Sequence, residues 1–569
     1  MAPRHGIVPV LPRGASPVVL KLWSQRLALG ALLGAFLVAP SAVILAQAFF
    51  PGGRFSLSLF AAMAANPVLL GSLRNSLVIA LGASAVAAAL ALPFAAVLGR
   101  WRIPGRTWLK AGVMIPLLLP PFAGAVAIRQ VLGRHGSLNL LLRDWGILDS
   151  PVDWLGGGMG GVIFLEGLHL FPILYFSLVH HFAALNGDSE EAALCFGGKG
   201  WRYYRKVLLP EISPGLLGGL ALVFVWAFTD LGTPLLMEYR QVIPYQAFSL
   251  ITDLDRNPMG HALAAVMGAA GLGGYWASQA LSRRQARSAK GFRPAPEKTP
   301  GRRPGFAASL ALALVLALAA VPSLAVVVQA FSRDWFLSIA PQVYTLDNFG
   351  DLFRHRITRG SIQTSLFLSS LAAVADLALG WWLARMVLQE RGAWARLWET
   401  LAMIPLALPG IVLAFGYVAL FAGTRLDPAG NPLFLLVMAY AMRRLPFAFR
   451  SALTGYRSMP DRIDEAAQTL GQGFWGRVRD IHLPLLAPHL LAAGMLVFAF
   501  SMLEVSDSLV LAMKEFYYPI TKAMYFLASR AGDGLNLAAA LAAVGMLILA
   551  GAIAWSGRLM GKGFGEMFR

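Results

Sequence analysis

Residues 191–197 read Glu-Ala-Ala-Leu-Cys-Phe-Gly, and residues 465–471 read Glu-Ala-Ala-Gln-Thr-Leu-Gly. In both stretches a tryptophan follows ten residues after the glutamate, and a Leu-Pro pair ends nineteen residues after it. Such a match in one register predicts that the chain holds two copies of one structural unit. The matching positions are Glu191, Ala192, Ala193, Gly197, Leu209 and Pro210 in the first copy and Glu465, Ala466, Ala467, Gly471, Leu483 and Pro484 in the second.

The composition places both copies in a membrane protein. Of the 569 residues, 57% are hydrophobic and 14% are charged. Apolar runs of about 20 residues recur, and this is the length that a helix needs to cross a bilayer. The runs lack the two-residue alternation of a membrane β-barrel, so we expect an all-α polytopic membrane protein. The twelve predicted spans are 27–50, 71–99, 111–130, 160–184, 214–237 and 260–281 in the first half and 305–331, 361–384, 398–421, 432–449, 488–512 and 535–556 in the second.

The first apolar run follows several basic residues, as it does in a secretory signal peptide. At residues 27–50 the run is too long for the apolar core of a signal peptide, so we expect it to remain as the first span. Cys195 is the only cysteine, which excludes a disulfide framework within the chain.

Further matches extend the repeat along both halves. Residues 114–116, Met-Ile-Pro, return 289 positions later as residues 403–405. Because six spans per copy is an even number, the two copies are predicted to be parallel and related by a pseudo-two-fold axis along the membrane normal. The predicted domains are a first transmembrane half at 1–281, a linker at 282–304 and a second transmembrane half at 305–569.

The formal net charge of +19 would suggest a nucleic-acid-binding protein if the chain were soluble. In a membrane protein, Lys and Arg gather instead in cytoplasmic loops, and this bias places both termini and both repeated motifs in the cytoplasm. The linker 282–304 is rich in Arg, Lys and Pro. We expect it to be flexible and to lie near anionic lipid rather than to bind nucleic acid.

The spacing of Glu-Ala-Ala, Gly and Leu-Pro resembles the EAA loop of permease subunits of binding-protein-dependent ABC importers, and both halves carry it. The resemblance implies a type I ABC importer fold with an EAA loop at 188–210 and another at 462–484. It implies that the positions given above couple transport to ATP hydrolysis. Its implied partners are two copies of an ABC ATPase subunit and a periplasmic solute-binding protein, and its implied location is the bacterial inner membrane.

Each EAA loop is expected to consist of two short helices. Gly197 and Gly471 are expected to turn the chain between them, because glycine adopts backbone conformations that other residues avoid. Pro210 and Pro484 are expected to end the second helix before the next span begins.

The sequence contains no GxxxxGK[ST] phosphate-binding loop. We therefore expect no cofactor in this chain, with ATP and Mg²⁺ bound by the partner ATPase. The sequence also lacks GxSxG, HExxH and Cys/His cluster patterns, so we predict no catalytic residue and no metal site. We interpret His180 and His181 as surface histidines at the end of a span.

Two acids, Asp230 and Glu504, are predicted to lie within the membrane, 274 residues apart, in the span that follows each EAA loop. An acid at such a depth is costly and usually faces a bundle interior or an aqueous cavity. One hypothesis is that both line the translocation pathway and favour a cationic solute. The alternative is that each pairs with an arginine in a helix interface, for example Arg74 or Arg129.

Within the family, the fused arrangement and residues 228–234, Phe-Thr-Asp-Leu-Gly-Thr-Pro, look most similar to ferric-iron permeases. Thiamine and 2-aminoethylphosphonate permeases are near relatives. The resemblance thus implies ferric iron as the solute, with thiamine, aminoethylphosphonate or another small solute as the alternative. The solute-binding protein is expected to contact the external loops, which are predicted at 131–159, 238–259, 332–360 and 513–534.

Two other classes of protein remain open. A secondary transporter would also show twelve spans and parallel halves, but it has no reason to carry paired EAA loops. An integral-membrane enzyme would need catalytic residues clustered at one face of the membrane, and the sequence shows none.

Overall fold

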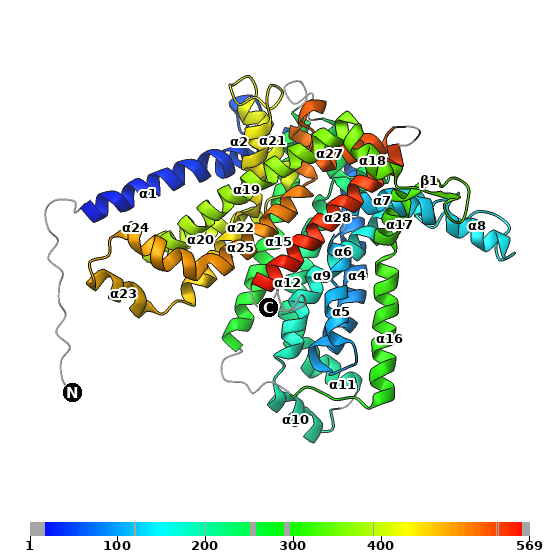
Figure 1. The fold of residues 1–569 in the computed structure, drawn as a ribbon, viewed down its shortest axis with the longest axis horizontal. Coiled ribbons are helices and arrows are strands. Elements are labelled where there is room, and N and C mark those ends of the chain that lie inside the picture. Colours follow the sequence, from blue (N-terminus) through cyan, green and yellow to red (C-terminus); the bar gives the residue numbers. More distant parts are fainter. Residues whose placement is uncertain are drawn as a thin grey trace.

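The computed structural model describes residues 17–559 except 119–120, 199, 251–257, 289–295, 391, 531 and 533. Most of the described chain is helical, which confirms the predicted helical class (Figure 1). The one sheet in the described part is an antiparallel hairpin of β1 (Ser332–Asp334) and β2 (Val343–Tyr344).

The helices follow the same general order in both halves. The α-helices of the first half are α1 (Pro17–Leu33), α2 (Ala39–Phe49), α3 (Ser58–Ala65), α4 (Pro67–Arg100), α5 (Arg106–Gly112), α6 (Ile115–Leu118), α7 (Pro121–Leu132), α8 (Ser137–Asp144), α9 (Met159–Ala183), α10 (Gly187–Cys195), α11 (Trp201–Tyr203), α12 (Leu209–Thr229), α13 (Gly232–Leu236), α14 (Ile243–Ser249) and α15 (Met259–Ser288). Those of the second half are α16 (Arg302–Ala319), α17 (Val321–Ala330), α18 (Asp347–Arg354), α19 (Arg356–Gln389), α20 (Ala393–Met403), α21 (Gly410–Phe421), α22 (Leu433–Arg457), α23 (Asp461–Thr469), α24 (Phe474–Arg477), α25 (Leu483–Met502), α26 (Ser506–Leu511), α27 (Ile520–Ala528) and α28 (Gly534–Leu559).

Eight helices within the described residues are long and apolar enough to cross a membrane. A ninth span is possible if Ala393–Leu406 and Gly410–Phe421, which meet at 103°, form one broken span. Two predicted spans correspond to long helices that fall outside this group, α15 and α22, and α22 carries Arg443 and Arg444 near its middle. The predicted span 111–130 is divided among α5, α6 and α7. The count of twelve spans and the pseudo-two-fold axis therefore stay predictions.

The first span runs from Trp23 to Phe49, close to the predicted 27–50, and includes a π-helical turn at Gly34–Val38. The linker predicted at 282–304 is shorter in the structure. Its first residues continue α15 to Ser288, and its last residues begin α16 at Arg302.

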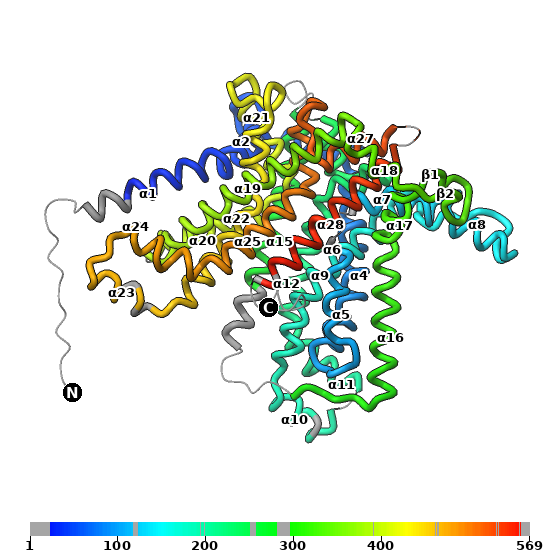
Figure 2. Tube along the Cα trace, in the orientation of Figure 1, coloured from blue at the N-terminus to red at the C-terminus, as the bar shows by residue number. Residues whose placement is uncertain are grey.

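The first helices of each half pack against the opposite half. The blue helix α2 lies beside α21 (Figure 2), and the Tyr417 hydroxyl there donates a hydrogen bond of 2.6 Å to the Phe36 carbonyl. In return, α16 packs on α5, where the Ser309 hydroxyl donates to the Pro104 carbonyl at 2.8 Å, and α17 packs on α7. The two halves are therefore interlocked through their first helices.

A charged cluster fixes α1 on the second half. Arg26 donates two hydrogen bonds to the Glu390 carboxylate, at 2.6 and 2.8 Å. Its guanidinium also lies 4.8 Å from the ring centre of Trp23 and 4.9 Å from that of Trp394. The charged side chains are only 13% and 6% exposed. A bidentate pair next to two adjoining aromatic rings specifies one register of α1 on its partner.

The two halves diverge toward one end of the molecule. In Figure 1, α10 lies at the bottom and α23 at the left, well apart from each other. At the opposite end, α7, α17, α18 and α27 gather in one region. The loops that carry the repeated motif are therefore separated, while the other ends of the halves are packed together.

Replacing Arg26 with Ala should destabilise the chain by about 3 kcal/mol, because it leaves a largely buried Glu390 carboxylate without its counter-charge. Thermal unfolding of the detergent-solubilised protein measures the loss. Replacing the exposed Arg54 with Ala is the matched control and should leave the midpoint unchanged. Equal midpoints for the two variants would contradict this role of the pair.

Candidate functional site

Both EAA loops have the same order of backbone elements. The first contains α10, a turn at Gly197, α11 and a π-helical turn at Tyr204–Leu208, and it leads directly into α12. The second contains α23, a turn at Gly471, α24 and a π-helical turn at Val478–His482, and it leads into α25. The two π-helical turns lie 274 residues apart, which is the same offset as the two motifs.

Gly197 and Gly471 end the first helix of each loop in the same way. Their φ angles are +71° and +75°, in the left-handed region that favours glycine. Beyond each glycine, the next amide donates back to the helix: Gly198 to the Ala193 carbonyl at 2.7 Å, and Gln472 to the Ala467 carbonyl at 3.0 Å. These are Schellman caps. The turn that the sequence predicts at both glycines is present.

The expectation that Pro210 and Pro484 end a helix is wrong. Helix continues through each proline, from Trp201 to Thr229 and from Phe474 to Met502. Each proline lies at the start of α12 or α25, directly after the π-helical turn. A π-helical turn widens the helix and so accommodates a residue that lacks an amide hydrogen. Each EAA loop is therefore joined rigidly to the membrane helix that follows it.

Large apolar side chains project from both loops at equivalent positions. Phe196 is 89% exposed and Leu470, its counterpart, is 86% exposed. Trp201 and Trp475 form a second matching pair and are 79% and 74% exposed. Paired apolar side chains of this size, exposed at matching places, are typical of a protein-binding surface.

The predicted alanine face of the second loop borders a hollow. Ala466 and Ala467 line it, and its volume is about 640 Å³. The other lining residues are Ile463, Leu470, Gly471, Gln472 and Ile481. The hollow is mostly apolar, with Gln472 as a polar side chain in its lining, and it can accept an apolar side chain of a partner.

In the first loop, Glu190 makes the ion pairs, and the predicted Glu191 is exposed. The Glu190 carboxylate accepts hydrogen bonds from Arg100 and Lys298, both at 2.5 Å. Burial alone would raise the pKa of Glu190, but the hydrogen bonds from Lys298 and Arg100 hold it below its ordinary value. Lys298 lies 108 residues away in the chain, so the motif gave no sign of this contact. The Glu465 side chain lies outside the described residues.

A cavity of about 210 Å³ lies between the two halves, and both Asp230 and Glu504 line it. Each acid lies just beyond the end of the helix that leaves an EAA loop. Asp230 follows Thr229, the last residue of α12, and Glu504 lies two residues after Met502, the last residue of α25. Breaks of this kind within a membrane are tolerated where the backbone borders a cavity or is buried in protein. The polar side chains that line the cavity belong to Glu166, His169, Thr229, Asp230, Arg443, Arg444, Glu504 and Ser506.

Glu504 is paired with arginines, as one of the two alternatives expected, but the partners differ from those suggested. Arg443 and Arg444 on α22 both donate to its carboxylate. Arg443 also pairs with the buried Asp507 at 3.2 Å. Arg129, one of the suggested partners, instead pairs with Glu238 at 2.8 Å. Glu504 thus faces the cavity with its charge compensated.

Asp230 has a different environment. One of its carboxylate oxygens accepts a hydrogen bond of 2.8 Å from the Thr233 amide. Its neighbour is Glu166 on α9, a buried acid that accepts a hydrogen bond of 2.7 Å from the Thr233 hydroxyl. Reading the sequence missed Glu166, Arg443 and Arg444, although each is a charged residue in a predicted span, which is the signal that could have found them.

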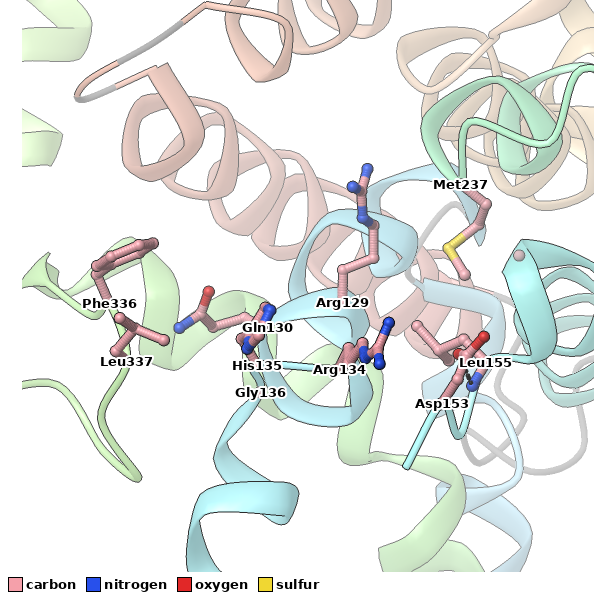
Figure 3. Close-up of a pocket in the computed structure, with 12 residues that line it drawn as sticks. Arg129, Gln130, Arg134, His135, Gly136, Asp153, Leu155, Met237, Phe336 and Leu337 are labelled. Carbon is pink, nitrogen blue, oxygen red and sulfur yellow. Dashed lines mark hydrogen bonds between the residues drawn. The ribbon is translucent and has the colours of Figure 1, made fainter. Parts of the chain in front are cut away.

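Another pocket, of about 380 Å³, is lined by residues of both halves (Figure 3). Arg129, Arg134 and His135 reach it from α7 and the residues after it, and Phe336 and Leu337 reach it from the β1–β2 hairpin of the other half. Two loops predicted to be external, 131–159 and 332–360, thus meet in one mixed basic and apolar surface.

No group of three His, Cys, Asp or Glu side chains among the described residues is arranged to hold a metal ion. Of the two neighbouring histidines, His181 contacts the Ser177 carbonyl oxygen at 2.6 Å through Nδ1, within α9. This contact lies on the same helix, at the end near the first EAA loop.

Comparison with known families accounts for both halves. The family described as "Binding-protein-dependent transport system inner membrane component" matches residues 91–287 and residues 376–558. Each match contains one EAA loop, and together they cover more than half of the chain.

Two named relatives match most of the chain, and a third matches part of it. The chain is 24% identical over 487 residues to the putative ferric transport system permease protein of Haemophilus influenzae, covering 83% of this chain and 75% of that protein. It is 26% identical over 434 residues to the thiamine transport system permease protein of Escherichia coli, covering 74% and 76%. It is 25% identical over 237 residues to the putative 2-aminoethylphosphonate transport system permease protein of Salmonella typhimurium, covering 40% and 86%. The chain therefore belongs to the family of binding-protein-dependent transport system inner membrane components, as a permease with both halves of a type I ABC importer fused in one polypeptide.

Proposed function

We propose that this chain forms the translocation pathway of an ABC importer and that two copies of an ATPase subunit drive it through the EAA loops. One observation carries the proposal: equivalent apolar side chains, Phe196 and Leu470, and Trp201 and Trp475, are exposed on two loops of the same construction. The chain itself performs no catalysis, and ATP and Mg²⁺ belong to the partner. The protein resides in the bacterial inner membrane with both termini in the cytoplasm.

The continuity of the helices supports this mechanism. A helix of 29 residues joins the first loop to Thr229, next to Asp230, and one of 29 residues joins the second loop to Met502, near Glu504. At 1.5 Å per residue each is roughly 40 Å long. Closure of an ATPase pair would bring the separated helices α10 and α23 together. The movement would reach the cavity directly, since helix continues from the loop to the cavity wall.

The pocket of about 380 Å³ that Arg129 and Phe336 line supports the expected role of a solute-binding protein. Its lining residues come from both halves, so a protein that docks there would sense their relative position. The solute would then pass through the cavity that contains Asp230 and Glu504.

Ferric iron is our first candidate for the solute, and thiamine, 2-aminoethylphosphonate or another small solute is the alternative. The acids Asp230 and Glu166 on the cavity wall would favour a cation, since Arg443 and Arg444 on the same wall are paired with Glu504 and Asp507. A route through the membrane needs only weak contacts with its cargo, because a strong site would hold the cargo in place.

Replacing Phe196 or Leu470 with Ser should weaken binding of the ATPase about tenfold or more, because burying such a side chain contributes about 1.5–3 kcal/mol. Titration of the solubilised permease with the ATPase that co-purifies with it measures the effect. Trp145→Ser removes another exposed large apolar side chain, from a loop predicted to be external, and is the control. Equal affinities for the three variants would contradict the proposal, and uptake without ATP in proteoliposomes would favour a secondary transporter.

Replacing Asp230 with Asn should lower solute uptake about tenfold, the loss expected for removing one charged contact, while leaving ATPase binding unchanged. The Thr233 amide can still donate to the new side chain, so the local fold is preserved. Uptake by proteoliposomes that contain the complete transporter measures the effect. Uptake equal to that of the unaltered protein would remove Asp230 from the pathway.

A further inference from the structure

Residues 296–301 form the end of the segment that joins the two halves, and they are bound to the first half. The Lys298 amide donates to the Arg100 carbonyl at 2.7 Å, and the Arg102 amide donates to the Lys298 carbonyl at 3.0 Å. This short parallel bridge places the segment along the turn between α4 and α5. Beyond the bridge, three hydrogen bonds between side chains hold the segment: two from Arg102 and Arg106 to Glu297, and one from Lys298 to Glu190.

Glu297 strengthens this attachment. Its carboxylate accepts hydrogen bonds from Arg102 at 2.5 Å and from Arg106 at 3.1 Å. These hydrogen bonds hold the pKa of Glu297 below its ordinary value. Arg106 in turn donates to the Leu98 carbonyl at 2.7 Å, near the end of α4. The carboxylate therefore stays charged at neutral pH and fixes the residue before Lys298.

Lys298 extends the attachment to the first EAA loop. Its ammonium group and the guanidinium of Arg100 donate to the two separate oxygens of Glu190. Arg100 and Glu190 are nearly buried, with 8% and 13% of their side chains exposed. Glu190 belongs to α10, so this helix is held between the end of α4 and the end of the joining segment.

Helix α10 depends on such contacts. It has only nine residues, and a helix of that length is marginal by itself in water. At its start, the Asn186 amide donates to Glu211 on α12 at 3.1 Å. The three-residue cluster of Arg100, Glu190 and Lys298 supplies an anchor on α4, which is a different membrane helix.

The sequence of the second half does not repeat this cluster. The last residue of α19 is Gln389, where the equivalent last residue of α4 is Arg100. The position that matches Glu190, 274 residues later, is the shorter Asp464. The anchor is therefore a property of the first EAA loop.

We propose that Glu297 and Lys298 are positioning residues for the first EAA loop. The end of the segment that joins the two halves would then form part of one of the two ATPase-binding sites. The two residues hold α10 to α4, so that a force applied to α10 moves α4 together with α12. The inference rests on the proposed function of the EAA loops. It predicts that the two loops, though alike in backbone, transmit force unequally.

The only cysteine of the chain, Cys195, is exposed at the last residue of α10 and provides a direct test. A spin label on Cys195 of the full chain in lipid nanodiscs reports the motion of α10 on the nanosecond timescale. Lys298→Ala and Glu190→Gln should shift the spectrum toward faster motion, and Lys298→Arg should restore the original spectrum. Arg303→Ala removes an exposed positive charge five residues further on and should cause no shift. An unchanged spectrum for Lys298→Ala would overturn the proposal.

Coupling gives a second readout that a purely structural contact would not change. In proteoliposomes with the co-purified ATPase and binding protein, Lys298→Ala should lower the solute transported per ATP by up to about fivefold, the factor that corresponds to loss of one partly exposed ion pair. Lys298→Arg should restore it. A normal ratio in the presence of a mobile α10 would overturn the positioning role.

The spin-label experiment needs no ATPase, so it can fail or succeed independently of the proposed function. Failure of the proposed function would appear instead as ATPase binding that is indifferent to Phe196→Ser and Leu470→Ser.

Discussion

The backbone of a membrane-spanning segment must satisfy its own hydrogen bonds, because the bilayer core offers no water to replace them. This constraint keeps the helices that leave the EAA loops continuous until they reach the cavity between the halves. A π-helical turn accommodates the proline at the start of each helix, so the helix is not interrupted there. These helices end at Asp230 in one half and near Glu504 in the other. There the backbone groups that have no helical hydrogen bond border a cavity or buried partners. The rigid connection between loop and cavity follows from this one requirement.

Apolar length and the repeated motif are local properties, and they were sufficient to predict the helical class, the first span and the glycine turns. The continuation of helix through Pro210 could not be predicted, because the spacing of apolar residues does not indicate a π-helical turn. The predicted span 111–130 is divided among three short helices, because the apolar pattern alone does not show whether a proline or a turn interrupts a helix. In the site, Asp230 and Glu504 were found from depth alone, but Arg443 and Lys298 contact residues more than 60 positions away. Such pairings depend on the packing of distant helices, which a single sequence does not specify.

The two halves share a backbone plan but differ in charge. In the second half, Glu504 lies beside two arginines of α22. In the first half, the matching positions on α9 are His169 and Leu170, and Asp230 lies beside another acid. At the first EAA loop, the cluster around Glu190 binds the segment that joins the halves. The sequence of the second half does not repeat this cluster, since Gln389 and Asp464 stand at the positions of Arg100 and Glu190. Fusion of the two copies into one chain allows them to diverge in this way, because each copy always occupies the same place.

The exchange of first helices between the halves has a consequence for synthesis. Arg26 meets its partner Glu390 across 364 residues of chain. At about 5–20 residues per second, a ribosome needs roughly 20 to 70 seconds to supply that partner. Throughout this interval the first span lacks its contacts with the second half. Its outward surface is accordingly apolar, with only 28% of its most apolar stretch buried even in the finished protein. Assembly of the first half is thus completed only after much of the second has been translated.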